Sequence, residues 1–210
     1  MSAPSPLVVK IGGGLLRAHG LAGLRRGCVE ALALARTRPV LVIPGGGPFA
    51  DAVRAVDARH GLGDPLAHTL ALQAMDQLGT LLRSMLPGAE PLAELRRPRV
   101  IGLLAAAEAF AERPEVPRSW HVTSDSLAAL AAEAIGATEA VLLKPVAGIF
   151  ARWPPGRKPL ATLTAAELRA LQADGEGRVV DSYLAEVVAR SGIAVVVRSP
   201  ESVGTRITPC

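Results

Sequence analysis

The sequence predicts an α/β fold, in which helices cover both faces of a mainly parallel sheet as a three-layer α/β/α sandwich. Short apolar runs alternate along the chain with segments whose apolar residues recur at helical spacing. The apolar runs are continuous, which is typical of parallel strands buried on both faces. The chain has 210 residues, of which 50% are hydrophobic and 3% aromatic, so we expect one domain over 1–210 with an aliphatic core.

The first half of the chain repeats one arrangement, a buried strand that runs into three glycines. Strands are expected at 7–11, before Gly12–Gly14, and at 40–43, which continues through Pro44 into Gly45–Gly47. Helices are expected at 21–36, after the second glycine loop, at 65–85 and at 105–110, with a strand at 100–104.

The second half continues the alternation. Thr123–Ser126 supplies capping side chains for a helix at 127–135 that Gly136 ends, and a strand follows at 140–143. After a loop at 151–159, we expect helices at 165–173 and 181–190 and a strand at 193–197. Because ligands of such sheets collect beyond the carboxyl ends of the strands, both glycine loops should lie at the ligand-binding edge.

Composition argues against several classes of protein. Lys and Arg number 23 against 19 for Asp and Glu, a difference of +4, and the basic residues are scattered without stacking aromatics, so we expect no nucleic-acid partner. Two cysteines and four unclustered histidines predict neither a disulfide framework nor a metal site. The chain shows no signal-peptide pattern and no apolar run of about 18 residues, so we expect a cytoplasmic protein without a membrane partner.

The two glycine loops are the first candidates for chemistry. Lys10 stands before Gly12–Gly14, where bare backbone N–H groups can approach an anion; the alternative is a sharp turn beside a solvated lysine. Gly45–Gly47 opens a helix, whose N-terminus adds partial positive charge. Neither loop has the Walker pattern or the Gly-x-Gly-x-x-Gly spacing.

Several polar residues have both a functional and a structural interpretation. Asp125 lies in a first helical turn, where it either orients a lysine or caps the helix. Lys144 follows a strand and should emerge at the same rim as Lys10, or it is a solvated charge. His68 and His121 either touch substrate or lie on the surface, and the same holds for the charged residues that follow the second glycine loop.

Five motifs in order resemble the amino acid kinase family over nearly the whole chain. The resemblance implies the amino acid kinase fold and an ATP-dependent kinase that uses Mg²⁺ and phosphorylates a small acidic or phosphate-bearing acceptor. It also implies a homodimer or larger homo-oligomer. The motifs are Val-Val-Lys10-Ile-Gly-Gly, Ile43-Pro-Gly-Gly-Gly, Thr123-Ser-Asp125-Ser-Leu-Ala-Ala-Leu, Leu142-Leu-Lys-Pro-Val-Ala-Gly-Ile149 and Val203-Gly-Thr-Arg-Ile207.

The same resemblance assigns roles to individual residues. Lys10 would contact the transferring phosphoryl group, Asp125 would organise the lysine, and Lys144 would complete the catalytic set. Positioning and charge neutralisation are what phosphoryl transfer needs most from a protein. The residues expected at the nucleotide are Gly12, Gly13, Lys144, Gly148 and Phe150; those expected at the acceptor are Gly45, Gly46, Gly47, Asp51, Arg54, His68, His121 and Thr123.

Within the family, the chain resembles the small archaeal-type kinases of methanofuran biosynthesis, which phosphorylate an aminomethylfuran-methyl phosphate. Three stretches carry this similarity, and they suggest a one-carbon carrier of the methanofuran type in a methylotroph. The stretches are Gly47-Pro-Phe-Ala-Asp51-Ala-Val-Arg54, the helical segment from Ala67-His68 to Asp76-Gln77, and Trp120-His-Val-Thr-Ser-Asp125.

Two departures from the family pattern leave alternatives open. Family members usually read Thr-Asp-Val-Asp-Gly-Ile where this chain reads Lys144-Pro-Val-Ala-Gly-Ile149, and many carry a second lysine where Asp181 stands. We hypothesise that Lys144 replaces that lysine. Without such compensation, the chain would be a non-catalytic or diverged binding or assembly subunit with the same fold. A third alternative is a kinase for another acceptor, such as an acylated amino acid or an isoprenoid phosphate.

Overall fold

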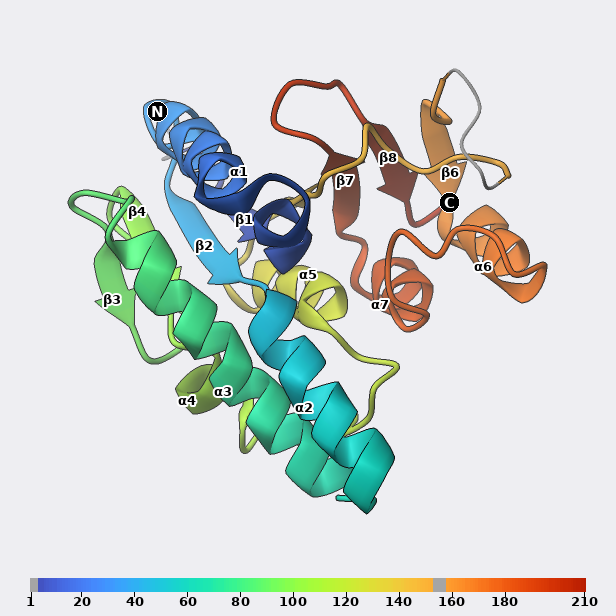
Figure 1. Cartoon of the computed structure of the whole chain (residues 1–210). Coiled ribbons are helices and arrows are strands. Elements are labelled where there is room, and N and C mark those ends of the chain that lie inside the picture. The colour runs from blue at the N-terminus through green and yellow to red at the C-terminus, as the bar shows by residue number, and fades with distance from the viewer. Residues whose placement is uncertain (1–3, 153–157) are drawn as a thin grey trace.

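The computed structural model describes residues 4–152 and 158–210. Their strands form one eight-stranded sheet in the order β3-β4-β2-β1-β5-β7-β8-β6, with helices on both faces (Figure 1). Six of the seven neighbouring pairs are parallel, and β7 with β8 is antiparallel. The mainly parallel three-layer fold is therefore confirmed. The strands are β1 (Leu7–Ile11), β2 (Val40–Pro44), β3 (Glu90–Leu92), β4 (Ile101–Leu104), β5 (Glu139–Leu143), β6 (Thr162–Thr164), β7 (Ala194–Arg198) and β8 (Thr205–Thr208).

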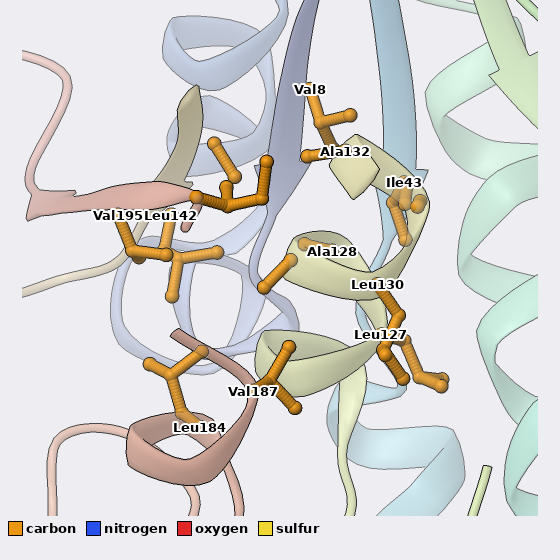
Figure 2. Close-up of a cluster of buried hydrophobic side chains, with 14 of the residues drawn as sticks. Val8, Ile43, Leu127, Ala128, Leu130, Ala132, Leu142, Leu184, Val187 and Val195 are labelled. Atoms are coloured by element: carbon orange, nitrogen blue, oxygen red, sulfur yellow. The ribbon is translucent and has the colours of Figure 1, made fainter. Parts of the chain in front are cut away.

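The helices divide into two layers around the sheet. They are α1 (Gly13–Leu34), α2 (Gly47–His60), α3 (Asp64–Arg83), α4 (Ala106–Phe110), α5 (Ser124–Ala134), α6 (Ala165–Ala173) and α7 (Leu184–Ser191). Successive residues of β1 point to opposite faces, so Val9 packs in the cluster with α1 and α3, and Val8 packs in the cluster with α5 and α7. Figure 2 shows the second cluster, where Leu127 and Ala128 of α5 lie against the sheet.

The central strands are found where the sequence predicts them, whereas three short strands at or next to the edges of the sheet are not predictable from it. β3 and β6 have three residues each and β8 has four, too few for an apolar period to appear. β3 also contains Pro91, which favours an edge position because proline cannot donate to the ladder. β3 accordingly forms one edge of the sheet.

The first helix differs most from its prediction. α1 begins at Gly13 rather than at residue 21, so Gly13 and Gly14 belong to a helix instead of a loop. Gly20, with φ 59° and ψ −154°, interrupts the helical backbone and divides α1 into two segments. Because the interruption shifts the phase of the apolar period, the segment before Gly20 does not read as helix in the sequence.

Helix termini follow their capping residues. The Thr123 hydroxyl accepts a hydrogen bond from the Asp125 amide at the start of α5, and Thr164 with Glu167 forms a capping box on α6. α7 begins at Leu184 rather than at 181, because Asp181 caps it by accepting from the Leu184 amide at 3.0 Å.

Two further expectations concern the chain as a whole. No helix in the described ranges is long and apolar enough to cross a bilayer. The loop expected at 151–159 falls partly on 153–157, which lie outside the described residues.

Candidate active site

A pocket of about 520 Å³ opens at the carboxyl ends of the central strands β1, β2 and β5. Lys10 on β1 pairs in register with Ile43 on β2 and Leu142 on β5, so the residues that follow these strands reach one rim. Gly12, Gly46 and Lys144 line the pocket from the three strand ends. The position is the one at which open parallel sheets bind their ligands.

The two glycine loops touch each other beneath this pocket. A Cβ atom added to Gly13 would lie 2.1 Å from the Cα of Gly47, and one added to Gly45 would lie 2.8 Å from the Gly13 nitrogen. A Cβ on Gly12 would come within 2.7 Å of the Leu143 carbonyl oxygen. Close approach of backbone to backbone is therefore one reason for glycine at these positions.

Only some of the loop amides are left to face an anion. The Gly12 amide donates to the Leu143 carbonyl at 3.0 Å, and the Gly45 amide donates to the Ile11 carbonyl at 2.9 Å. Gly13 and Gly14 open α1 and Gly47 opens α2, and first-turn amides have no acceptor within their own helix. All three residues line the pocket, so an anion there meets the positive ends of two helices.

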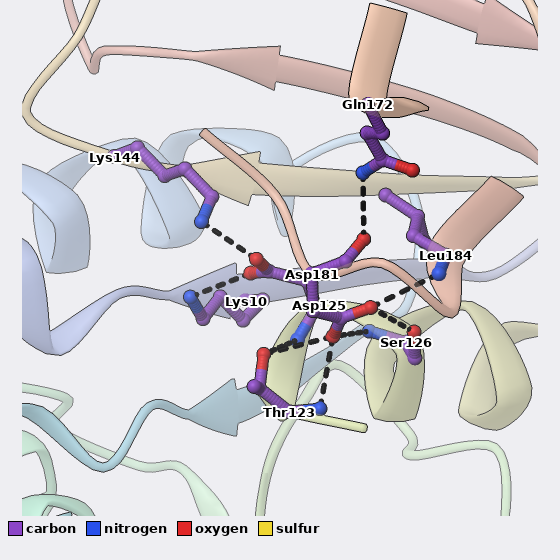
Figure 3. A network of polar contacts seen from close by, with 8 residues as sticks. All are labelled: Lys10, Thr123, Asp125, Ser126, Lys144, Gln172, Asp181 and Leu184. Atoms are coloured by element: carbon purple, nitrogen blue, oxygen red, sulfur yellow. Dashed lines mark hydrogen bonds and ion pairs between the residues drawn. The ribbon is translucent and has the colours of Figure 1, made fainter. Parts of the chain in front are cut away.

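Two lysines, one on β1 and one directly after β5, converge on Asp125 in the pocket (Figure 3). The Lys10 ammonium donates to Oδ1 of Asp125 at 2.8 Å, and the Lys144 ammonium donates to Oδ2 at 2.7 Å. The side chain of Asp125 is 5% exposed and that of Lys144 is 13% exposed. The chain has only three lysines, at positions 10, 144 and 158, so two of the three meet at one carboxylate.

The electrostatics of this cluster fix its protonation. Burial raises the pKa of a carboxyl group, but the ammonium groups of Lys10 and Lys144 hold the pKa of Asp125 well below its usual range. Burial lowers the pKa of Lys10, and the Asp125 carboxylate opposes that shift. Two lysines therefore share the one carboxylate of Asp125, and the nearby Asp181 also acts on Lys10.

Asp181 holds the helix that carries Asp125. Its carboxylate accepts from the Thr123 amide at 2.9 Å, from the Thr123 hydroxyl at 2.8 Å and from the Ser126 amide at 3.0 Å (Figure 3). The same carboxylate caps α7 at Leu184, so it ties the starts of α5 and α7 together. Burial and the nearby Asp125 raise the pKa of Asp181, and its hydrogen bonds to Ser126 and Thr123 act in the opposite direction.

The pocket has two sides, which flank β1. On the β2 side, helices α1, α2 and α3 contribute Arg17, Arg54, His68 and Met75. Burial, and secondarily Arg118, lowers the pKa of His68, whose Nε2 atom has no hydrogen-bond partner among the described residues. The β5 side is lined by Pro145, Val146, Phe150, Glu176, Gly177, Arg178 and Val179.

Most of the site residues expected from the sequence line this one pocket, and four do not. Gly45 is packed behind Gly13, and a Cβ on Gly148 would lie 2.6 Å from the Thr205 hydroxyl, so both have packing roles. Asp51 lies behind the pocket and pairs with Arg17 and Arg54. His121 is exposed, and its Nδ1 atom lies 3.0 Å from the Ser182 hydroxyl. The expected residues that do line it are Lys10, Gly12, Gly13, Gly46, Gly47, Arg54, His68, Thr123, Asp125, Lys144 and Phe150.

Arg17, Arg178 and Trp120 are among the pocket residues that were not expected from the sequence. Arg17 and Arg178 carry no sequence signal that separates them from the chain's other arginines. Trp120 has a weak one, because it is one of two tryptophans in a chain with 3% aromatic residues. An isolated tryptophan in a polar loop is a reasonable marker of a ligand pocket.

Two ammonium groups beside the N-termini of two helices are typical of phosphotransferases, which position and neutralise a phosphoryl group. A model of the amino acid kinase family matches residues 89–199, and the chain belongs to this family. Family membership makes it an enzyme of the ATP-dependent kinase class.

Similar proteins include two archaeal kinases. The chain is 28% identical over 174 residues to [5-(aminomethyl)furan-3-yl]methyl phosphate kinase of Methanocaldococcus jannaschii, covering 80% of this chain and 79% of the relative. It is 26% identical over 219 residues to uridylate kinase of Methanothrix thermoacetophila, covering 96% and 93%.

Solved structures show the same fold at low sequence identity. The uridylate kinase of Archaeoglobus fulgidus superposes with a TM-score of 0.72 at 22% identity, over 96% of this chain and 99% of that one. The aspartate kinase of Synechocystis gives a TM-score of 0.75 at 18% identity, over 98% of this chain and 40% of that one. The amino acid kinase fold expected from the sequence is confirmed.

Proposed function

We propose that the chain transfers the γ-phosphoryl group of ATP to a phosphate-bearing acceptor of the aminomethylfuran-methyl phosphate type. The observation that carries this proposal is the cluster of Lys10, Asp125 and Lys144 at the meeting point of two helix N-termini. An oxygen of the acceptor phosphate forms a bond to the γ-phosphorus as the bond to the β-phosphate oxygen breaks, and ADP leaves. The two ammonium groups neutralise the charge on the moving group.

The acid–base state of the pocket favours an acceptor that is already ionised. Asp125 is bound to two lysines and its pKa is held low, so it is a poor base for an alcohol. Glu176 lines the β5 side of the pocket, whereas we place the acceptor on the β2 side, so Glu176 is not positioned as a base for the acceptor. A phosphate or a carboxylate needs no base at neutral pH, which supports an acidic acceptor over a neutral one.

In this proposal Lys144 supplies the second cation that many family members place where Asp181 stands. The Lys144 ammonium lies against the same carboxylate as that of Lys10, so both face one anion. Asp181 is engaged by five donors at the starts of α5 and α7, a role that a lysine cannot perform. Position 144 thus supplies the cation while Asp181 ties two helices, and this arrangement supports a catalytic protein over a binding subunit.

The nucleotide belongs on the β5 side of the pocket. Phe150 and Val146 offer apolar surface to a base there, and Gly13 and Gly14 offer amides to the phosphates. Within residues 4–152 and 158–210, no three His, Cys, Asp or Glu residues are placed to hold a metal. Mg²⁺ would therefore enter with the phosphates of ATP, as is usual for this cation.

The furan acceptor is proposed because the archaeal relative of that name matches four-fifths of the chain. Acceptors of the other relatives, uridylate and acetylglutamate, are the alternatives. We further propose that residues 1–210 act as one domain in the cytoplasm and assemble as a homodimer or larger homo-oligomer.

The test is to incubate the protein with Mg-ATP and each candidate acceptor and to follow ADP release together with ³¹P NMR of the product. We expect a diphosphate to form from aminomethylfuran-methyl phosphate, faster than products from uridylate, acetylglutamate or isopentenyl phosphate. Preference for another acceptor would refute the furan assignment. No transfer to any acceptor, with no thermal stabilisation by Mg-ATP, would favour the non-catalytic alternative, because saturating ligand stabilises by about 2.7 kcal/mol at a hundred times Kd.

A further inference from the structure

Two arginines from different helices lie together at the acceptor side of the pocket. Arg17 belongs to the first segment of α1, before the break at Gly20, and Arg54 belongs to α2. Both line the pocket, and both bind the carboxylate of Asp51, Arg17 at Oδ2 and Arg54 at Oδ1 at 3.2 Å. Residues far apart in the sequence are thus held as a pair by one acid.

The pair of Arg17 and Arg54 has more positive charge and more N–H donors than Asp51 can bind. One carboxylate balances only one of the two guanidinium groups, so a net positive charge is left at the pocket wall. The side chains of Arg17 and Arg54 are 58% and 46% exposed, so their remaining N–H groups are open to a ligand. Guanidinium groups match phosphate oxygens with two parallel hydrogen bonds, which makes an arginine pair a typical phosphate site.

The position of the pair relates it to the acceptor rather than to the nucleotide. α2 follows β2, which is the neighbour of β1 on one side. Lys144 follows β5, the neighbour of β1 on the other side, and the loop 176–179 lines the pocket on that side too. α2 also begins at Gly47, against Gly13 and close to the lysine cluster. A phosphate held by Arg17 and Arg54 therefore approaches the transfer centre from the side facing away from the nucleotide.

The surface around the arginine pair suits a small planar ring attached to that phosphate. The guanidinium carbon of Arg54 lies 4.7 Å from the ring centroid of Trp120, a cation–π contact that fixes the arginine. The Trp120 indole N–H donates to Asp57 at 2.7 Å, so the ring itself is held. Ala71, Leu72 and Met75 of α3 continue the lining as an apolar wall.

We propose that Arg17 and Arg54 anchor the acceptor's own phosphate group, with Asp51 as the positioning residue that holds the two guanidinium groups together. The ligand class is the phosphate monoester of a small ring-bearing alcohol, whose ring lies along Trp120 and the apolar wall. This inference rests on the proposed function, and it names the residues that make the enzyme select a phosphate acceptor.

The experiment compares two ligands that differ only in the phosphate. Aminomethylfuran-methyl phosphate and the corresponding alcohol are titrated calorimetrically, without nucleotide, into the intact wild-type chain, R17A, R54A and R17A/R54A. The matched control is R59A, an exposed arginine in the last turn of α2. R17K and R54K keep the positive charge but lose the paired N–H donors of the guanidinium group. Circular dichroism verifies the fold of every variant.

We expect wild type and R59A to bind the phosphate much more tightly than the alcohol. Each arginine-to-alanine change should weaken phosphate binding about tenfold, a typical loss for a charge-assisted hydrogen bond at a partly exposed site, and leave alcohol binding unchanged. The lysine variants should fall between. In turnover assays, KM for the acceptor should rise while KM for ATP stays within about twofold.

Binding and turnover separate this inference from the proposed function. If wild type binds the phosphate but transfers nothing to it, the kinase proposal fails and the phosphate anchor stands. If R17A/R54A keeps the wild-type preference for phosphate over alcohol, or if wild type has no such preference, the anchor is wrong. A rise in KM for ATP instead of the acceptor would place these arginines at the nucleotide and overturn the inference as well.

Discussion

Lys144→Met removes one of the two cations at Asp125 while keeping an apolar stem of similar length. The lost contact is a charge-assisted hydrogen bond of 2.7 Å between side chains that are 13% and 5% exposed. Such a bond contributes about 1.5–3 kcal/mol to stability. Asp125 keeps Lys10 as a partner, so we expect a loss below the roughly 3–5 kcal/mol that follows when a buried charge loses its only partner.

The effect on the reaction should be much larger than the effect on folding. Removing one preorganised donor from a transition state of this kind costs about 10²–10³-fold in kcat. The melting temperature should fall by only about 2–4 °C per kcal/mol for a domain of this size. The assay is kcat for ADP release at saturating acceptor, with the melting temperature measured on the same samples.

Lys158 provides the control, because it is exposed and is the only other lysine besides Lys10. Lys158→Met should retain kcat within about twofold, since surface charges contribute little. Lys144→Arg keeps the charge but not the compact ammonium, and we expect it to restore part of the rate. A folded Lys144→Met variant with the wild-type kcat would refute the idea that Lys144 has taken over the role of the second lysine.

Two further predictions concern groups near the transfer centre. Asp181→Asn replaces one of the two carboxylate oxygens that accept hydrogen bonds from the starts of α5 and α7. This change should lower the free energy of unfolding in urea by about 2 kcal/mol. An unchanged free energy of unfolding would contradict the positioning role of Asp181. Burial lowers the pKa of His68, so the unfolded chain takes up its proton first and stability falls as pH drops through about 6.5. His68→Gln should remove up to about 1.4 kcal/mol per pH unit of that slope between about pH 7 and pH 5, and the same slope in both proteins would contradict the assignment.

The cluster of Lys10, Asp125 and Lys144 was predictable because it follows from strand geometry. Lys10 and Lys144 stand at the ends of two apolar runs, and parallel strands bring their carboxyl ends to one edge. Asp125 was placed by the capping stretch Thr123–Ser126, although α5 begins at Ser124, three residues before the predicted start. These three positions needed only local patterns and one rule of topology.

The side of the pocket formed by α1, α2 and α3 was less predictable because it depends on tertiary placement. Arg17 reaches the pocket from a helical segment that the break at Gly20 hides from the apolar period. Gly45 and Gly148 read as ligand-binding glycines, yet their backbones lie too close to neighbouring atoms for a Cβ. Sequence alone does not separate a glycine that faces an anion from one that faces another chain segment.

A crystal structure with ADP, aluminium fluoride and the phosphate acceptor measures most directly whether one crevice gathers the reacting groups. The planar fluoride complex takes the place of the moving phosphoryl group. We expect it between ADP and the acceptor phosphate, within hydrogen-bond distance of the ammonium groups of both Lys10 and Lys144 and of the amides that open α1 and α2. A fluoride complex bound elsewhere, or one that neither lysine reaches, would contradict the assignment of this pocket as the phosphoryl-transfer site.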